Sequence, residues 1–137
     1  MDTISPERRS ENMRRIRGKN TRPELVVRKT LFAMGYRYRL HSAKLPGKPD
    51  LVFSKQRKVI FVHGCFWHSH SNSRCNIVRL PKSNSEYWAE KLKRNVTRDA
   101  IRKAELRRLG WKTMTIWECQ TRSISRQLWR IKRFLNA

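Results

Sequence analysis

The stretch from Pro46 to Cys75 constrains the fold and the chemistry of this chain more than any other segment. It contains a Pro-Gly-Lys-Pro-Asp turn that ends at Asp50, an apolar run over residues 59–62, and then His-Gly-Cys-Phe-Trp-His over residues 63–68. Three of the four histidines and two of the three cysteines lie within it. The apolar run therefore leads to polar, metal-binding side chains at its carboxyl end, where open α/β sheets place their functional sites.

The surrounding segments predict a single α/β domain in which helices flank a mixed sheet. The 137 residues give room for one domain with its own core. Apolar patterning predicts strands over residues 36–40, 51–53, 59–62 and 111–117, and helices over residues 21–34, 85–109 and 124–135. Thr21 and Glu24 have the spacing of a capping box at the first of these helices. Residues 54–58 close a hairpin, so we expect Asp50 and His63 to lie close together.

The helix over residues 85–109 is the longest predicted element. We expect Ser85 to be its N-cap, and Trp88, Leu92 and Val96 to form its apolar face. Lysine and arginine cover the rest of its surface. One face of this helix should therefore pack on the domain while the other presents positive charge.

Residues 1–20 are interpreted as a basic N-terminal arm that precedes a domain over residues 21–137. A short helix is expected from Pro6 to Arg17, but only Met13 and Ile16 are apolar on it, among arginines that include Arg14 and Arg15. Such a helix buries little apolar area, so it is expected to lie on a partner. The alternative is a frayed, solvated helix.

The charge of the chain predicts a polyanionic partner. Its 33 Lys and Arg against 10 Asp and Glu give a net charge of +23, spread along the whole sequence. Nucleic acid fits this charge best. A membrane surface would also attract it, but no apolar run approaches the ~20 residues of a membrane-spanning helix and no signal-peptide pattern opens the chain. We therefore expect no membrane partner and a cytoplasmic, nucleoid-associated protein.

Asp50, His63 and His68 are the candidate reactive residues. A carboxylate with a backbone carbonyl can hold magnesium against phosphate oxygens. A histidine near its ordinary pKa of about 6.5 can take a proton from water or donate one to a leaving oxygen. The alternatives are an aspartate that completes a turn and histidines that are hydrogen-bonded polar residues. The position of Asp50 beside the histidine-rich strand favours a reactive site.

Cys65, His70, Cys75 and Cys119 are candidate zinc ligands. Four such ligands make a closed, tetrahedral structural site, and this site would hold the long loop over residues 69–85. The alternative is a set of free thiols. Phe66 and Trp67 also allow two interpretations, because adjacent aromatic residues belong to a core or act as a wedge between base pairs.

Several of these motifs together resemble the very-short-patch (Vsr) mismatch repair endonucleases. The resemblance runs from about Arg9 to Cys119. It rests on the following matches: Pro-Gly-Lys-Pro-Asp over residues 46–50, Phe-Val-His-Gly-Cys-Phe-Trp-His over residues 61–68, Glu86-Tyr87-Trp88 with Lys91 and Asn95, Leu-Gly-Trp over residues 109–111, and Trp117-Glu118-Cys119. It implies a fold like the type II restriction endonucleases, a structural zinc, and a magnesium-dependent nick 5′ to the thymine of a G·T mismatch.

The resemblance also implies roles for residues of the reactive site. Asp50 would be the catalytic carboxylate that binds Mg²⁺, with the backbone carbonyl of Val62 as a further ligand. His68 would activate the attacking water, and His63 and Glu24 would complete the site. The wider nuclease superfamily carries Glu-x-Lys at the position of residues 61–63, and the mismatch family shares the departure seen here.

The remaining implied roles concern zinc and DNA. Cys65, His70, Cys75 and Cys119 resemble the zinc ligands, although the family's cysteine follows its zinc histidine more closely than Cys75 follows His70. The residues implied to bind DNA are the aromatic wedge of Phe66, Trp67 and Trp88, the arm tip Met13 with Arg14 and Arg15, and Lys91 and Asn95. The implied substrate is double-stranded DNA, bound by a monomer. Downstream repair proteins would then act on the nicked product. Two alternatives stay open: a nickase of the same fold without mismatch preference, and a zinc-stabilised nucleic-acid-binding module without catalysis.

Overall fold

The structure is a computed structural model that describes residues 21–68, 70 and 83–137. It contains a four-stranded sheet in the order β1-β2-β3-β4, with β2 antiparallel to both β1 and β3, and β3 parallel to β4. The strands are β1 (Arg39–Leu40), β2 (Leu51–Phe53), β3 (Lys58–His63) and β4 (Lys112–Trp117). The prediction of a single α/β domain with a mixed sheet is confirmed.

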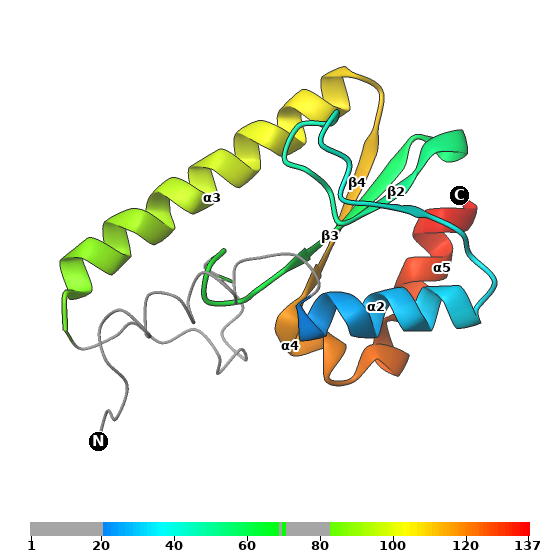
Figure 1. Cartoon of the computed structure of the whole chain (residues 1–137), viewed down its shortest axis with the longest axis horizontal. Coiled ribbons are helices and arrows are strands. Elements are labelled where there is room, and N and C mark those ends of the chain that lie inside the picture. The colour runs from blue at the N-terminus through cyan, green and yellow to red at the C-terminus, as the bar shows by residue number, and fades with distance from the viewer. Residues whose placement is uncertain (1–20, 69, 71–82) are drawn as a thin grey trace.

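Helices cover both faces of this sheet (Figure 1). The α-helices are α2 (Arg22–Ala33), α3 (Ser85–Arg108), α4 (Glu118–Thr121) and α5 (Leu128–Asn136), and 3₁₀ turns lie at η1 (Ser54–Gln56) and η2 (Ile124–Gln127). The long helix α3 runs along one face, and α2 and α5 lie on the other. In the described part of the chain, no helix is long and apolar enough to cross a membrane.

Two cores form because successive side chains of a strand point to opposite faces of the sheet. On the α2 and α5 side, Ile60 of β3 packs with Leu31 and Ile131. On the α3 side, Phe61 packs with Leu106. β2 and the middle of β3, residues 59–62, are therefore apolar throughout, as expected for strands buried on both faces.

Several predicted boundaries are wrong. The strand expected over residues 36–40 is only β1, because Tyr36 and Tyr38 turn their hydroxyls to Asn136 and to the Arg28 carbonyl. The helix expected over residues 124–135 begins with the tighter turn η2.

The start and the apolar face of α3 also differ from prediction. Its N-cap is Asn84, with φ at 56°, and not Ser85. Val96 is 42% exposed. Asn95 is only 8% exposed, and its side-chain amide donates a hydrogen bond to the Trp67 carbonyl. The residues of α3 that face the domain therefore include polar ones.

Some predictions fall outside the described residues. These are the arm over residues 1–20, with Met13, Arg14 and Arg15, the zinc ligand Cys75, and most of the loop over residues 69–85.

Candidate active site and metal centres

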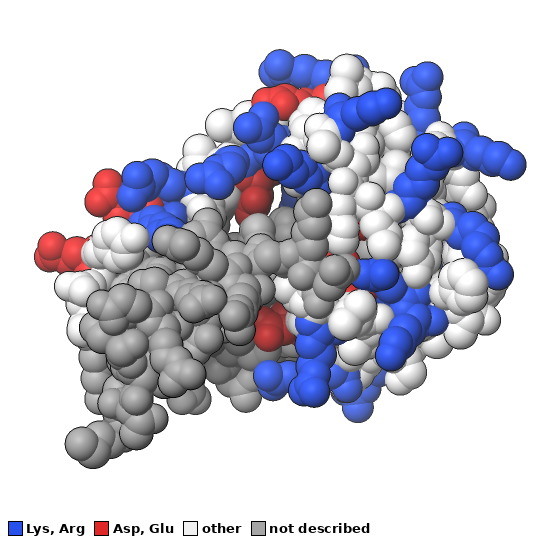
Figure 2. All heavy atoms as spheres, viewed as in Figure 1, with Lys and Arg blue, Asp and Glu red and all other residues white. Residues whose placement is uncertain are grey.

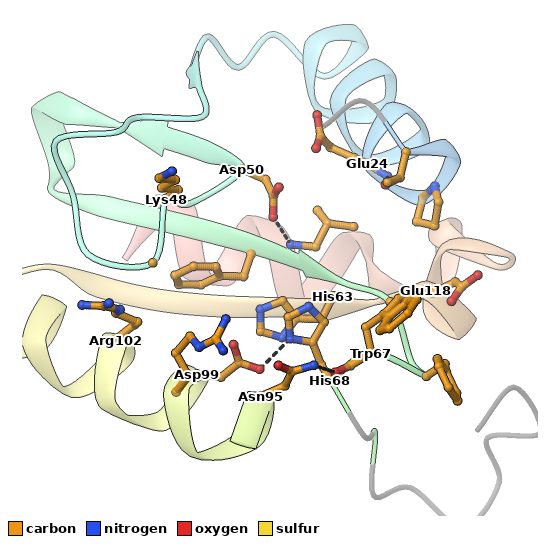
Figure 3. Close-up of a pocket in the computed structure, with 18 of the residues that line it drawn as sticks. Glu24, Lys48, Asp50, His63, Trp67, His68, Asn95, Asp99, Arg102 and Glu118 are labelled. Atoms are coloured by element: carbon orange, nitrogen blue, oxygen red, sulfur yellow. Dashed lines mark hydrogen bonds and ion pairs between the residues drawn. The ribbon is translucent and has the colours of Figure 1, made fainter. Parts of the chain in front are cut away.

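A cavity of about 500 Å³ opens between α3 and the sheet, and it contains the predicted reactive residues (Figure 3). Asp50 enters it from the residue before β2, and His63 from the last residue of β3. The cavity is lined by the acids Glu24, Asp50, Asp99 and Glu118, by His63 and His68, and by the cations Lys48, Arg98, Arg102 and Lys103. The hairpin of β2 and β3 thus brings Asp50 and His63 into one site.

Asp50 is held by the strand beside it. Its Oδ2 accepts a hydrogen bond from the Val62 N–H at 2.7 Å. Burial raises the pKa of Asp50 to about 7, against the opposing effect of the Val62 hydrogen bond, and the negative charge of Glu24 adds to the rise. A bound cation would stabilise the ionised form of a carboxylate that is buried beside a second acid, so Asp50 is suited to bind one.

Glu24 reaches the same site from α2. The Thr21 hydroxyl accepts from the Glu24 N–H at 3.4 Å, so Thr21 is the N-cap as predicted. The Glu24 side chain does not complete the expected capping box. It is only 2% exposed, and its Oε2 contacts His41 Nε2 at 2.8 Å and Arg28 Nη1 at 3.2 Å.

Sequence analysis missed His41 because no local motif marks it. The possible ligand atoms of Glu24, His41 and Asp50 all lie within 4.8 Å of one another, which makes this group a candidate divalent-cation site. The one signal available in the sequence was that His41 is the only histidine outside the cluster at residues 63–70.

His63 and His68 stack face to face, with ring centroids 3.8 Å apart and planes inclined by 6°. His68 Nδ1 lies 2.5 Å from Asp99 Oδ2. When Nδ1 carries the proton and donates it to Asp99, Nε2 keeps a free lone pair and can act as a base. Sequence analysis missed Asp99, although it lies four residues after Asn95 and thus on the same face of α3.

His63 has a different environment from His68. Burial lowers the pKa of His63 to about 2, and the nearby His68 and Lys103 add to the fall. His63 Nδ1 is buried, and it has no hydrogen-bond partner among the described residues. His63 is therefore a neutral group near pH 7, and of the two histidines only His68 has the geometry of a general base.

Cys65, His70 and Cys119 form a second cluster beside the cavity. The His70 Nδ1 atom lies 3.6 Å from Cys65 Sγ and 3.4 Å from Cys119 Sγ. Zinc bonds of about 2.3 Å to sulfur and 2.0–2.1 Å to nitrogen, at tetrahedral angles, place sulfur and nitrogen about 3.6 Å apart. The His70 ring stacks on Trp117 at 4.2 Å, which fixes its orientation. Three of the four predicted zinc ligands thus have the spacing that zinc requires.

The predicted aromatic wedge is a packed group of rings. The Phe66 centroid lies 5.0 Å from that of Trp67 and 5.6 Å from that of Trp88. Lys91 Nζ lies 5.7 Å from the Trp67 ring and 5.4 Å from the Trp88 ring. Trp67 is only 8% exposed, and its carbonyl accepts from Asn95. The five residues predicted to bind DNA from this side therefore lie together, and Phe66, Trp67 and Asn95 among them line the cavity.

Positive charge surrounds this site. Figure 2 shows Lys and Arg side chains spread over the visible face, with few acidic side chains among them. Two acids of the cavity, Asp50 and Asp99, point toward the Val62 N–H and toward His68 (Figure 3). A polyanion is thus attracted to the surface, while recessed carboxylates and a histidine base are available at one point on it. Carboxylates, a histidine and surrounding cations in one cavity are the groups that a metal-dependent phosphodiesterase requires.

Comparison with known proteins specifies this class further. Residues 1–74 match the family model described as DNA mismatch endonuclease Vsr. The chain is 45% identical over 135 residues to the type II nicking enzyme V.XorIIP of Xanthomonas oryzae pv. oryzae. This alignment covers 98% of this chain and 97% of the relative. It is 41% identical over 114 residues to the DNA mismatch endonuclease Vsr of Escherichia coli, covering 83% of this chain and 71% of the relative.

The type II nicking enzyme V.NmeAIP of Neisseria meningitidis is 43% identical over 122 residues, covering 89% of this chain and 85% of the relative. The chain belongs to the Vsr family, and it is a DNA endonuclease. The family and the endonuclease class predicted from the motifs are confirmed, and the alternative of a binding module without catalysis is excluded.

Proposed function

We propose that this endonuclease nicks one strand of duplex DNA on the 5′ side of the thymine in a G·T mismatch, and so initiates short-patch mismatch repair. The family model and the Escherichia coli relative both carry the description of a mismatch endonuclease. The observation that carries the proposal is that Asp50 and the His68–Asp99 pair line the same cavity. The enzyme acts as a monomer and leaves its product to downstream repair proteins.

Magnesium is the metal that fits the Asp50 side of the cavity. Asp50 and Glu24 lie close enough for the charge of Glu24 to raise the Asp50 pKa, and a divalent cation relieves this repulsion. Asp50 and the Val62 carbonyl would hold it, since magnesium prefers oxygen ligands. Bound there, magnesium would supply positive charge to the phosphate oxygens and would lower the pKa of a coordinated water.

His68 is the general base in this proposal. Asp99 accepts the Nδ1 proton, which orients the ring and leaves Nε2 to take a proton from the attacking water. The water oxygen then bonds to phosphorus as the bond from phosphorus to the leaving oxygen breaks. His63 stays neutral and keeps the His68 ring in place through the stack.

A structural zinc is the second proposed metal. Cys65, His70 and Cys119 would supply three ligands, and Cys75 the fourth. Zinc at this point would tie the segment after β3 to the end of β4. It would also close the loop that follows His70.

The proposed DNA interface combines two parts of the chain. Phe66, Trp67 and Trp88 enter the duplex beside the weakly stacked G·T pair, with Lys91 and Asn95 next to them. The arm over residues 1–20 precedes the domain over residues 21–137, and it closes on the other groove through Met13, Arg14 and Arg15.

A nickase without mismatch preference is the second candidate. Two observations favour it: several relatives are described as type II nicking enzymes, and Trp67, one of the two tryptophans of the proposed wedge, is buried. A buried ring must first be uncovered before it can enter DNA.

Cleavage of end-labelled duplexes that differ only in one base pair, G·T, G·C or A·T, tests the proposal. We expect a magnesium-dependent cut in the thymine strand of the G·T duplex alone. Equal cutting of all three duplexes would establish the second candidate.

Variants of the His68–Asp99 pair test the proposed base. His68→Ala and Asp99→Asn should lower the single-turnover rate by roughly 10² to 10⁴. The control is Glu90→Gln, which removes an exposed acid of the same helix. A full rate in Asp99→Asn would contradict the role given to the pair.

A further inference from the structure

Lys103 differs from the other cations that line the catalytic cavity. Lys48, Arg98 and Arg102 are exposed, whereas Lys103 is half-buried. All four side chains line the same cavity, but only that of Lys103 is partly shielded from solvent. A cation at this position is withdrawn from the counterions and phosphates that the outer surface meets.

The surroundings of the Lys103 ammonium place it beside the reactive histidines. Its Nζ lies 5.9 Å from the centroid of the Phe61 ring. Its charge contributes to the lowered pKa of His63, so it is felt at that ring. Burial lowers the pKa of Lys103 itself, and the negative charge of Asp99 opposes this fall. The ammonium thus lies near an apolar ring, in the cavity that His63 and His68 also line.

Within residues 21–68, 70 and 83–137, the Lys103 ammonium has no hydrogen-bond or ion-pair partner. Asp99 lies one helical turn earlier, a spacing that often forms an ion pair, but its Oδ2 contacts His68. Glu105 pairs with Arg102 instead. A partly desolvated ammonium with unused donors is unfavourable unless a ligand completes its hydrogen bonds.

We propose that Lys103 is a catalytic residue that donates a hydrogen bond to a non-bridging oxygen of the phosphodiester being cleaved. The inference rests on the proposed nicking reaction at Asp50 and His68. Negative charge on the phosphate oxygens shifts as the water oxygen attacks, and a fixed donor in a partly dry site stabilises that charge more than an exposed one does. The exposed cations supply general attraction to the duplex, which salt screens.

The test compares Lys103→Met with Lys93→Met in the full chain. Methionine keeps an unbranched apolar side chain and removes the charge, and Lys93 is an exposed lysine on α3 outside the catalytic cavity. Single-turnover nicking rates are measured at saturating enzyme on the best-cut duplex, with Kd and the melting temperature measured on the same preparations. Lys103→Arg serves as a third variant, because it restores the charge at the same position.

We expect Lys103→Met to lower the nicking rate by roughly 10²-fold, the loss typical for removal of one such donor. Its Kd should change by the same small factor as that of Lys93→Met, whose rate should stay at the wild-type value. Lys103→Arg should recover most of the lost rate. If Lys103→Met is too unstable to assay, Lys103→Gln replaces it, because glutamine also removes the charge and keeps a polar, unbranched side chain.

Two results would overturn the inference. One is a Lys103→Met rate within about threefold of the wild type, and the other is a loss confined to Kd, as expected of any surface cation. A wild-type chain that nicks no duplex would instead overturn the proposed function, so the two failures are distinguishable.

Discussion

Replacing Asp50 by asparagine should stabilise the fold while it abolishes cleavage. Burial and the charge of Glu24 raise the pKa of Asp50 from 3.8 to about 7, so the ionised carboxylate is unfavourable in the metal-free protein. Asparagine has nearly the same shape and keeps an oxygen that can accept from the Val62 N–H. Its amide can also donate to Glu24, where the aspartate only repels.

The size of the effect follows from the pKa. A rise from 3.8 to about 7 corresponds to roughly 4 kcal/mol at about 1.4 kcal/mol per pKa unit. Between these two values the folded protein binds more protons than the unfolded chain, so stability falls as the pH rises through this window. The advantage of Asp50→Asn should therefore be near zero at pH 4 and reach roughly 2 to 4 kcal/mol above pH 7.

Urea unfolding of both proteins at a series of pH values, without added divalent cation, measures this difference. At a slope of about 2 kcal/mol per M, the midpoint of Asp50→Asn should lie roughly 1 to 2 M higher at pH 8. Added magnesium should stabilise only the wild type, because the variant lacks the ligand. Equal midpoints at pH 8, or a difference that does not shrink toward pH 4, would refute the argument.

Further predictions concern zinc, salt and the aromatic residues. The wild type should hold about one zinc per chain by metal analysis, and Cys119→Ala should lose it and melt at a lower temperature, whereas zinc retained in Cys75→Ala would exclude only that ligand. The logarithm of the affinity for duplex DNA should fall linearly with the logarithm of the salt concentration, and a flat profile would contradict electrostatic binding. Trp67→Ala should cost roughly 3 kcal/mol of unfolding free energy, against less than about 0.5 kcal/mol for the exposed Trp129→Ala. Phe66→Ala should lower G·T cleavage with little loss of stability, and unchanged cleavage would exclude the wedge.

The sheet was predictable where strands are buried on both faces. Residues 51–53 and 59–62 are continuous apolar runs, and they form β2 and β3 almost as expected. The alternation of aromatic and basic residues over residues 36–40 predicted a longer strand than the structure has. Tyr36 and Tyr38 are held instead by hydrogen bonds from their hydroxyls. The local sequence pattern therefore identified the strands that are buried on both faces. It failed for the segment whose conformation depends on tertiary contacts.

The candidate site shows the same division. Asp50 and His63 were predicted to meet because one hairpin joins them, so short-range topology was sufficient. Asp99 and His41 come from segments far from the histidine cluster, and nothing in the local sequence connects them to it. Glu24 had two possible roles, and only its contact with His41 shows that it faces the site and not the N-terminus of its own helix.

The parallel pairing of β3 with β4 explains why the candidate zinc cluster lies next to His68. His63 pairs with Trp117 at the end of the ladder, so Cys65 and Cys119, each two residues further, reach the same height beyond the sheet. The turn after β3 then returns at once, with the His68 N–H bound to the Gly64 carbonyl. His68 thus lies on the short segment between two zinc-ligand candidates and contacts α3 through Asp99. The candidate zinc cluster and the proposed general base share one turn, so we expect a variant that loosens the cluster to displace His68 as well.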